Sequence, residues 1–187
     1  MIHTNENIFN DKDVLEGFLN KVESCVANTE LKDGELQADK TYDTTIRRNK
    51  VAWITDKEIR YAISDYVMGV NVGTLGIDLY PFQAEVQYAE YRAEDAGFHE
   101  WHADHDMFDD NIKGVSCRKY SATMQLDTMG KDYEGGKFEI QNLTLPEQFY
   151  TRGSFILFPS PIIHRVAPVT KGIRRSLVFF FHGPRWK

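Results

Sequence analysis

Cysteine is scarce in this sequence, and its scarcity excludes one class of protein. Only Cys25 and Cys117 occur among the 187 residues, too few for the disulfide framework of a small secreted domain. The pair also lacks the close spacing of a cysteine metal site. These observations favour a reducing compartment, and we expect a cytoplasmic protein.

Long apolar runs and clusters of positive charge are missing as well. No run approaches the roughly 20 apolar residues of a membrane-spanning helix, and residues 1–7 lack the basic stretch and apolar core of a signal peptide. Lysine and arginine number 22 against 28 aspartates and glutamates, and no basic run would follow a phosphate backbone. We expect an unexported protein that binds neither membranes nor nucleic acid. Its oligomeric state is left open.

Apolar and aromatic residues are plentiful enough for one folded domain. The sequence is 42% hydrophobic and 13% aromatic, whereas disordered chains have low hydrophobicity. It contains no internal repeat. We predict a single domain over residues 1–187, with a helical support region over 1–80 and a β core over 81–187.

Two helices are predicted in the N-terminal part. Apolar residues at three-to-four spacing predict a helix over residues 13–27. A second helix is predicted to begin at Thr55, whose hydroxyl forms a capping box with Glu58, and to end within residues 69–73, which hold two glycines. Residues 28–50 are polar and aperiodic, which predicts a long surface connection and a candidate lid.

Short β-prone runs separated by turns follow Pro81. Seven or eight short strands after two helices predict a mainly β fold with N-terminal helices (α+β), an antiparallel sandwich or jelly-roll barrel braced by helices on one side. The predicted strands cover residues 86–92, 98–105, 118–126, 137–141, 153–158, 163–166 and 174–181.

A candidate metal site lies in the β core. His102 and Asp104 are two residues apart, so on a strand both side chains would leave the same face. His164, from a distant strand, would complete a set of two histidines and one carboxylate, which leaves three positions of an octahedral metal open. Taken singly, each has an ordinary structural explanation: a strand histidine, a turn carboxylate and a packed strand start.

A candidate carboxylate anchor follows His164 after a short turn. Only one of Arg174 and Arg175 can point inward from a strand, and we choose Arg174. Its guanidinium would grip the far carboxylate of a dicarboxylic keto acid in a bidentate fork. We expect His99, His105 and His182 to be polar surface or to lie behind the ligands, and Gly135-Gly136 to form a turn without chemistry.

Five segments in order resemble the 2-oxoglutarate and iron(II) oxygenases, in the branch that contains prolyl 4-hydroxylases of bacterial and viral type. The resemblance runs from about Val86 to Trp186. Its segments are Val86-Gln87-Tyr88-Ala89-Glu90-Tyr91, Trp101-His102-Ala103-Asp104, Arg118 to Leu126, Tyr133-Glu134-Gly135-Gly136, and His164 to Arg174.

The resemblance implies a double-stranded β-helix (jelly-roll) core and a dioxygenase that hydroxylates an unactivated carbon, with a prolyl residue of a peptide or protein as the favoured substrate. It implies iron(II) on His102, Asp104 and His164, 2-oxoglutarate on Arg174, and dioxygen, with ascorbate as a further candidate ligand. Tyr91 and Gln125 become candidate contacts of 2-oxoglutarate. Residues 106–114 are a second candidate lid.

Three alternatives remain open. The enzyme would act on another amino-acid side chain or a small molecule; the chain would be a cupin-like metal-binding module without turnover; or it would be a degenerate oxygenase that serves as an interaction domain. Cupins use a closer histidine pair and a downstream glutamate, and a bare metal site has no use for Arg174.

Overall fold

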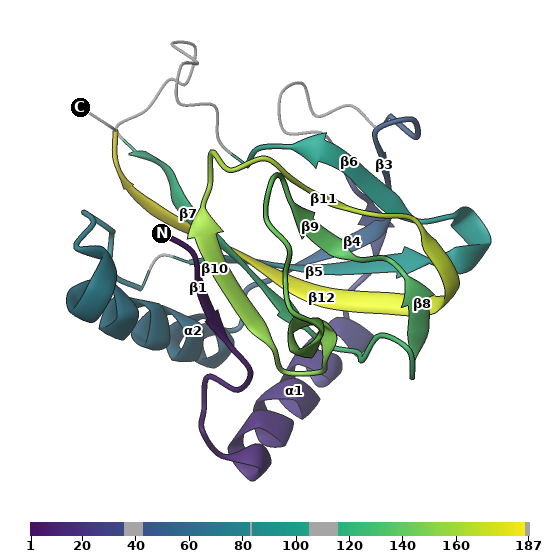
Figure 1. The fold of residues 1–187 in the computed structure, drawn as a ribbon. Coiled ribbons are helices and arrows are strands. Elements are labelled where there is room, and N and C mark those ends of the chain that lie inside the picture. Colours follow the sequence, from purple (N-terminus) through teal and green to yellow (C-terminus); the bar gives the residue numbers. More distant parts are fainter. Residues whose placement is uncertain (36–42, 83, 105–115, 186–187) are drawn as a thin grey trace.

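Two antiparallel sheets face each other, and two helices cover the outer face of the larger one (Figure 1). The computed structural model describes residues 1–35, 43–82, 84–104 and 116–185. The eight-stranded sheet has the order β1-β10-β7-β12-β5-β4-β2, with β8 paired to β12. Its strands are β1 (His3–Asn5), β10 (Phe155–Pro159), β7 (Ser116–Gln125), β12 (Val169–Pro184), β5 (Glu85–Arg92), β4 (Lys50–Ile54), β2 (Lys32–Asp33) and β8 (Tyr133–Gly135).

The four-stranded sheet lies across from it and has the order β3-β6-β11-β9. It contains β3 (Arg47–Arg48), β6 (Phe98–His102), β11 (His164–Val166) and β9 (Phe138–Ile140). All pairings between named strands are antiparallel. This architecture confirms the predicted mainly β fold with a double-stranded β-helix core and helices on one side.

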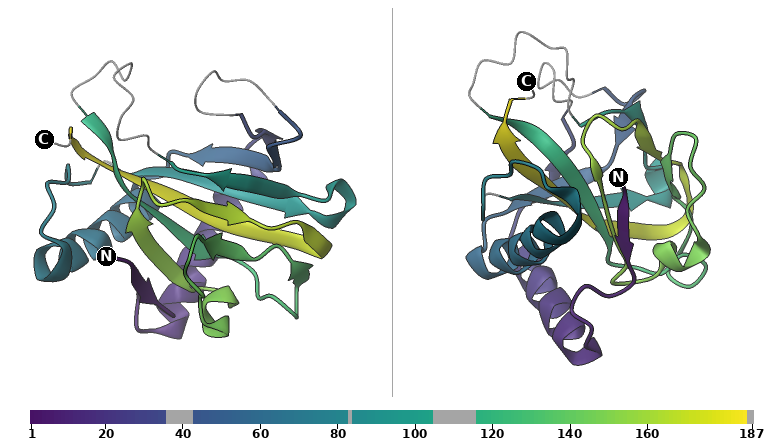
Figure 2. Two further views of the ribbon diagram at one scale, coloured as in Figure 1. Left: turned by 45° about the horizontal axis from the view of Figure 1, so that its top comes forward. Right: turned by 60° about the vertical axis from the view of Figure 1, so that its left-hand side comes forward.

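The first helix, α1 (Lys12–Ala27), confirms the predicted range, and Asp11 caps it by accepting hydrogen bonds from two main-chain amides. The second, α2 (Lys57–Val70), is capped by Asp56, whose carboxylate accepts from the amides of Glu58 and Ile59. The predicted capping box on Thr55 was wrong, because the carboxylate one residue later occupies the N-cap position. Figure 2 shows the two helices on one side of the molecule.

Residues 28–54 contribute more strands than the sequence predicts. The surface connection predicted over residues 28–50 was wrong where β2 and β3 form. The helical support region predicted over residues 1–80 also contains β1 and β4, so it is not purely helical. A two-residue strand has no periodicity that could be recognised in a sequence. These strands form because each pairs with the edge of a neighbouring strand: β1 with β10, β2 with β4, β3 with β6, and β4 with β5.

The predicted strands of the β core are present, with shifted ends. The strand expected over 98–105 ends at His102, and the last strand begins at Val169, ahead of the expected residue 174. A short strand, β8, was not predicted at all. Within the described residues, no helix has the combined length and apolar character that a membrane crossing requires.

Side-chain alternation divides the interior into two cores. One core joins the large sheet to α1 and α2, and the other lies between the two sheets. The helix-facing core includes Tyr88, Met124, Leu177, Phe179 and Phe181. The core between the sheets includes Ala89, Tyr91, Phe138, Ile156 and Phe158. The second core surrounds the polar site described next.

Candidate metal centre and anion site

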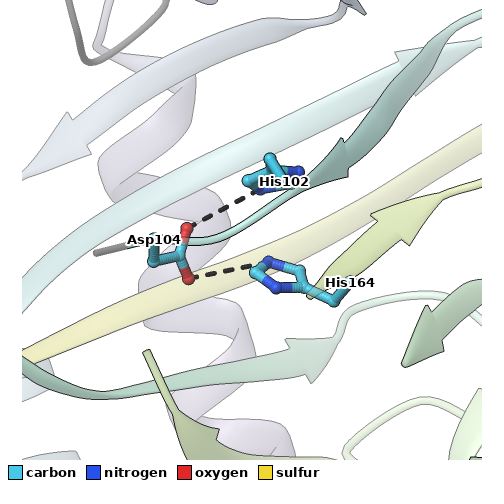
Figure 3. Close-up of side chains that lie close together, drawn as sticks. All are labelled: His102, Asp104 and His164. Atoms are coloured by element: carbon cyan, nitrogen blue, oxygen red, sulfur yellow. Dashed lines mark ion pairs between the residues drawn. The ribbon is translucent and has the colours of Figure 1, made fainter. Parts of the chain in front are cut away.

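The three predicted metal ligands converge between the sheets (Figure 3). His102 ends β6 and His164 begins β11, and the two are paired across these strands. One ligand atom from each of His102, Asp104 and His164 lies within 4.8 Å of the others. The Asp104 carboxylate lies between the imidazoles, with Oδ1 3.7 Å from His102 Nε2 and Oδ2 3.6 Å from His164 Nε2.

Asp104 reaches this position from a loop and not from a strand. Because β6 ends at His102, strand alternation does not orient Asp104 as the sequence analysis supposed. Its main-chain amide instead donates to the carbonyl oxygen of Ser160, at 2.9 Å. The Ser160 hydroxyl is in turn hydrogen-bonded to that of Ser121. The loop is thus fixed to the segment that follows β10.

Main-chain carbonyls set the tautomer of both histidines. His102 Nδ1 lies 2.7 Å from the Glu100 carbonyl oxygen, and His164 Nδ1 lies 2.9 Å from the Ile162 carbonyl oxygen. A carbonyl only accepts, so each Nδ1 carries the proton and donates it. Each Nε2 is left with a lone pair directed at the Asp104 side, which is the arrangement that metal-binding histidines usually have.

The electrostatics favour the ligand forms of these groups. Burial, followed by the neighbouring His164, lowers the pKa of His102 to about 4, so its imidazole is neutral at neutral pH. Burial alone would raise the pKa of Asp104, but His164 and His102 outweigh it and hold that pKa below its usual range. A neutral imidazole and an ionised carboxylate are what a metal ion binds.

One atom of the cluster lacks the partner that a buried polar atom normally has. Asp104 Oδ2 is buried and accepts no hydrogen bond from the described residues. A buried carboxylate oxygen without a donor is costly unless a cation compensates it. The donor set of two imidazole nitrogens and one carboxylate also suits iron(II). The residues present therefore fit a bound divalent metal ion.

Arg174 lies in the same cavity and is 1% exposed. Its guanidinium donates to the Ser176 hydroxyl and to Gln125 Oε1, both at 3.1 Å. Within the described residues it forms no ion pair, and its Nε has no acceptor. A buried guanidinium with unused donors requires an anion for compensation.

Tyr133 lies beside Arg174, although it was not among the predicted site residues. Its hydroxyl is buried and lacks a hydrogen-bond partner of good geometry. Burial raises the pKa of Tyr133, and the positive charge of nearby Arg174 opposes that rise. Gly136, which has a φ of +60°, leaves room here, because a Cβ would lie 3.1 Å from Arg174 Cδ and 3.4 Å from the Tyr133 ring. Gly136 thus leaves space beside Arg174 and Tyr133, in addition to forming part of a turn.

The other predicted contacts lie close by. The Tyr91 ring centroid is 5.3 Å from the Arg174 guanidinium carbon. Gln125 orients Arg174, and its own Nε2 has no acceptor. The cavity has a volume of about 50 Å³ and opens to solvent at its mouth. Its polar lining consists of Arg47, Gln87, Tyr91, His99, His102, Asp104, Thr123, His164, Arg174 and Ser176.

The three remaining histidines differ in position. His99 stacks on His102 with ring centroids 3.6 Å apart and lines the cavity. Of the two positions expected for it, on the polar surface or behind the metal ligands, it takes the second. His182 lies outside the cavity, with Nε2 3.3 Å from a Glu85 carboxylate oxygen. His105 and the candidate lid at 106–114 fall outside the described residues.

Arg47 is a charged cavity residue that was not among the predicted site residues. It was assigned to the surface connection, yet it is buried and lines the cavity. No local pattern distinguishes it from the adjacent Arg48. Tyr133, in contrast, had a signal, because it is an aromatic phenol at the start of one of the segments that carry the family resemblance.

The fold and the cluster together define a class: double-stranded β-helix proteins with a facial site of two histidines and one carboxylate, the arrangement of non-haem iron(II) oxygenases. The family model of the 2OG-Fe(II) oxygenase superfamily matches residues 86–182. The chain belongs to this superfamily. The family implies iron(II), 2-oxoglutarate and dioxygen as cofactor and co-substrates.

Individual relatives agree with this assignment. A PKHD-type hydroxylase of Nitrobacter winogradskyi is 38% identical over 81 residues, which are 42% of this chain and 35% of that protein. The chain thus spans about a third of the length of this curated relative.

Solved structures extend the similarity of fold to the whole chain. A prolyl-4-hydroxylase of Pseudomonas putida has a TM-score of 0.69 at 21% identity, covering 100% of this chain and 93% of its own. A prolyl hydroxylase of Trichoplax adhaerens, solved with a peptide fragment of the hypoxia inducible factor oxygen degradation domain, has a TM-score of 0.71 at 18% identity, covering 96% and 82%.

Proposed function

We propose that this chain is an iron(II)- and 2-oxoglutarate-dependent dioxygenase that hydroxylates an unactivated carbon. Its second product would be succinate, formed with CO2 from 2-oxoglutarate. One observation carries the proposal: a metal-ligand cluster and a buried arginine without a counter-charge line one cavity. A divalent metal and a dicarboxylate would compensate both at once.

In the proposed site, His102, Asp104 and His164 would hold iron(II) through the two Nε2 atoms and the carboxylate. Iron, when bound, would supply the oxidising chemistry that couples loss of CO2 from 2-oxoglutarate to hydroxylation. The two main-chain carbonyls would keep both imidazoles in the metal-binding tautomer. The hydrogen bond from Asp104 to Ser160 would keep the carboxylate in place.

The far carboxylate of 2-oxoglutarate would lie against Arg174. Gln125 and Ser176 already hold the guanidinium by accepting from it, so its remaining donors are oriented before the anion binds. The Tyr133 hydroxyl would donate to the same carboxylate. Tyr91 and the unused Nε2 of Gln125 would be additional donors.

A prolyl residue in a peptide or protein is the proposed target. This part rests on the similarity to a PKHD-type hydroxylase and on a fold shared with prolyl hydroxylases, one of them solved with a peptide. Fold alone hosts many substrates, so the residue that is hydroxylated has to be measured. Another amino-acid side chain or a small molecule is the alternative.

The test is succinate formation from 2-oxoglutarate by the purified protein with iron(II) and ascorbate, with and without a panel of proline-rich peptides. We expect turnover that is lost in His102→Ala and Arg174→Ala and retained in His182→Ala. The third variant is the matched control, because His182 lies outside the cavity.

The outcomes separate the candidate functions. Peptide-stimulated succinate together with a hydroxylated proline in the mass spectrum would support the full proposal. Turnover stimulated only by a free small molecule would keep the oxygenase and replace the substrate class. Tight metal binding without any turnover would contradict the proposal and favour a metal-binding module.

A further inference from the structure

A second buried arginine lines the cavity, and 2-oxoglutarate does not account for it. Arg47 in β3 is 9% exposed and contributes to the lining beside the metal-ligand cluster. It is paired across the small sheet with His99, whose ring stacks on His102. Arg174 lies instead among Gln125, Ser176 and Tyr133. The two arginines therefore serve different parts of one cavity.

The contacts of Arg47 are all with neutral acceptors. Its Nε donates to Asn49 Oδ1 at 2.7 Å, one terminal nitrogen donates to the Glu35 carbonyl oxygen at 3.2 Å, and the other donates to Gln87 Oε1 at 3.0 Å. Within the described residues it forms no ion pair. These three bonds hold the guanidinium but leave its charge uncompensated, and two N–H groups remain for another acceptor.

The main chain around Arg47 also fixes its position. Gly34 packs so closely that a Cβ there would lie 2.5 Å from Arg47 Nε and 2.8 Å from its guanidinium carbon. The amide of Gly34 donates to the Asn49 carbonyl oxygen. A long charged side chain normally loses rotamer freedom when it binds, and here that loss has already occurred on folding.

A count of charges shows that one anion is still missing. Asp104 is the single carboxylate among the described lining residues, and His102 and His164 have Nε2 free for the metal. A divalent metal, Arg47 and Arg174 bring four positive charges. Asp104 and 2-oxoglutarate bring three negative ones. The loaded cavity would retain one uncompensated positive charge in a water-poor environment, which is costly unless the substrate neutralises it.

We propose that Arg47, held by Gln87 and Asn49, binds a carboxylate of the substrate itself, so that the substrate is an amino acid or a peptide whose own carboxylate lies close to the carbon that is hydroxylated. This inference rests on the proposed function and narrows its substrate class. It favours a free amino acid or a C-terminal residue over an internal residue of a neutral peptide segment.

Binding calorimetry tests the proposal without turnover. The protein is loaded with manganese(II) and N-oxalylglycine, an unreactive analogue of 2-oxoglutarate, and titrated with the common L-amino acids, their N-acetyl forms and the matching amides. We expect at least one acid to bind at least about tenfold more tightly than its amide, a factor that corresponds to ~1.4 kcal/mol. Arg47→Gln should abolish that preference.

Two variants serve as controls. Arg48→Gln removes the same charge from the neighbouring residue, which donates to main-chain carbonyls outside the cavity, and should keep the preference. Arg47→Lys keeps the charge but loses the planar fork, and should retain part of the preference. Because the comparison of acid with amide uses the unaltered protein, it does not depend on whether a variant folds.

The outcomes are distinct. If no acid in the panel binds tenfold better than its amide, the proposal is overturned while the oxygenase stands. If Arg47→Gln weakens the analogue and keeps the preference for acids, Arg47 belongs to the 2-oxoglutarate site and the proposal is again overturned. If the unaltered protein binds neither manganese nor the analogue, the proposed function fails and this inference fails with it.

Discussion

The two faces of the large sheet are buried to a similar degree but differ in chemistry. Toward the helices, β12 presents Leu177 and Phe179, which are both 0% exposed. Toward the small sheet, the same strand presents Arg174 and Ser176, which are each 1% exposed. Since successive residues of a strand point to opposite faces, a single strand builds the core on one side and the site on the other.

This difference shows that burial alone does not identify a core. The helix-facing residues gain free energy by leaving water, at about 25 cal/mol per Å² of apolar surface. The cavity-facing polar groups were removed from water without full compensation, as at Arg174 Nε, Asp104 Oδ2 and the Tyr133 hydroxyl. Buried polar atoms without partners are rare in folded proteins, so their concentration here marks a binding site.

The largest expected effect is on the helix-facing side. Phe179→Ala should lower the free energy of unfolding by about 3–5 kcal/mol, because it leaves a cavity in a fully buried core. Urea denaturation measures this loss. Metal affinity per folded molecule should stay unchanged. The neighbouring Val178→Ala, on the cavity side of the same strand, is the matched control and should cost less, because Val178 borders the open cavity.

The second-largest effect is expected on the cavity side, where a substitution should weaken ligand binding and leave stability intact. Arg174→Met should raise the KM for 2-oxoglutarate about 10- to 100-fold, in line with ~1.5–3 kcal/mol for hydrogen bonds to a charged group. The ligand-free protein should be at least as stable as before, because a buried cation without a counter-charge is removed. Steady-state kinetics and thermal unfolding test both parts. A large fall in Tm with an unchanged KM would mean that Arg174 is a structural residue.

A smaller increase in the KM for 2-oxoglutarate is expected when the neutral Tyr133 hydroxyl, which lies beside Arg174, is removed. Tyr133→Phe removes a hydroxyl that has no partner of good geometry in the described structure. It should raise the KM for 2-oxoglutarate about tenfold, the lower end of the range for a hydrogen bond to a charged group, and leave kcat nearly unchanged. Tyr150→Phe is the matched control, because that hydroxyl already donates to the Phe138 carbonyl oxygen. Equal KM values in the two variants would exclude Tyr133 from the anion site.

The smallest expected effect is on the pH dependence of stability, and it arises at Glu85, which belongs neither to the helix-facing core nor to the cavity. The close approach of His182, ahead of the charge of Arg118, lowers the pKa of Glu85 from 4.5 to about 2 in the folded protein. A depressed carboxyl pKa stabilises the fold above the unfolded value and loses that contribution as pH falls from 4.5 to about 2.

Glu85→Gln should remove this part of the acid sensitivity. Because the Glu85 side chain is 45% exposed, solvent screening limits the difference to less than about 1 kcal/mol. Urea midpoints of the two proteins, compared above and within this pH range, measure it. A variant whose midpoint falls with pH as steeply as that of the unaltered protein would show that Glu85 carries no such contribution.

The sequence by itself determined the features that depend on local pattern. The three-to-four spacing of apolar residues predicted α1, and β-prone runs between turn signals predicted β5, β7 and the middle of β12. The sequence also proposed the candidate site, because His102, Asp104 and His164 together form a plausible metal-ligand set and Arg174 follows them as a carboxylate anchor.

Only the tertiary structure decided which residues without a local pattern take part. Arg47 and Arg48 are equivalent in the sequence, yet pairing of β3 with β6 places one in the cavity and the other outside it. Asp104 is oriented by Ser160, which lies 56 positions further along the chain. Tyr133 lies beside Arg174 because β8 pairs with β12. In each case the deciding contact joins segments far apart in sequence, and no local periodicity records such a contact.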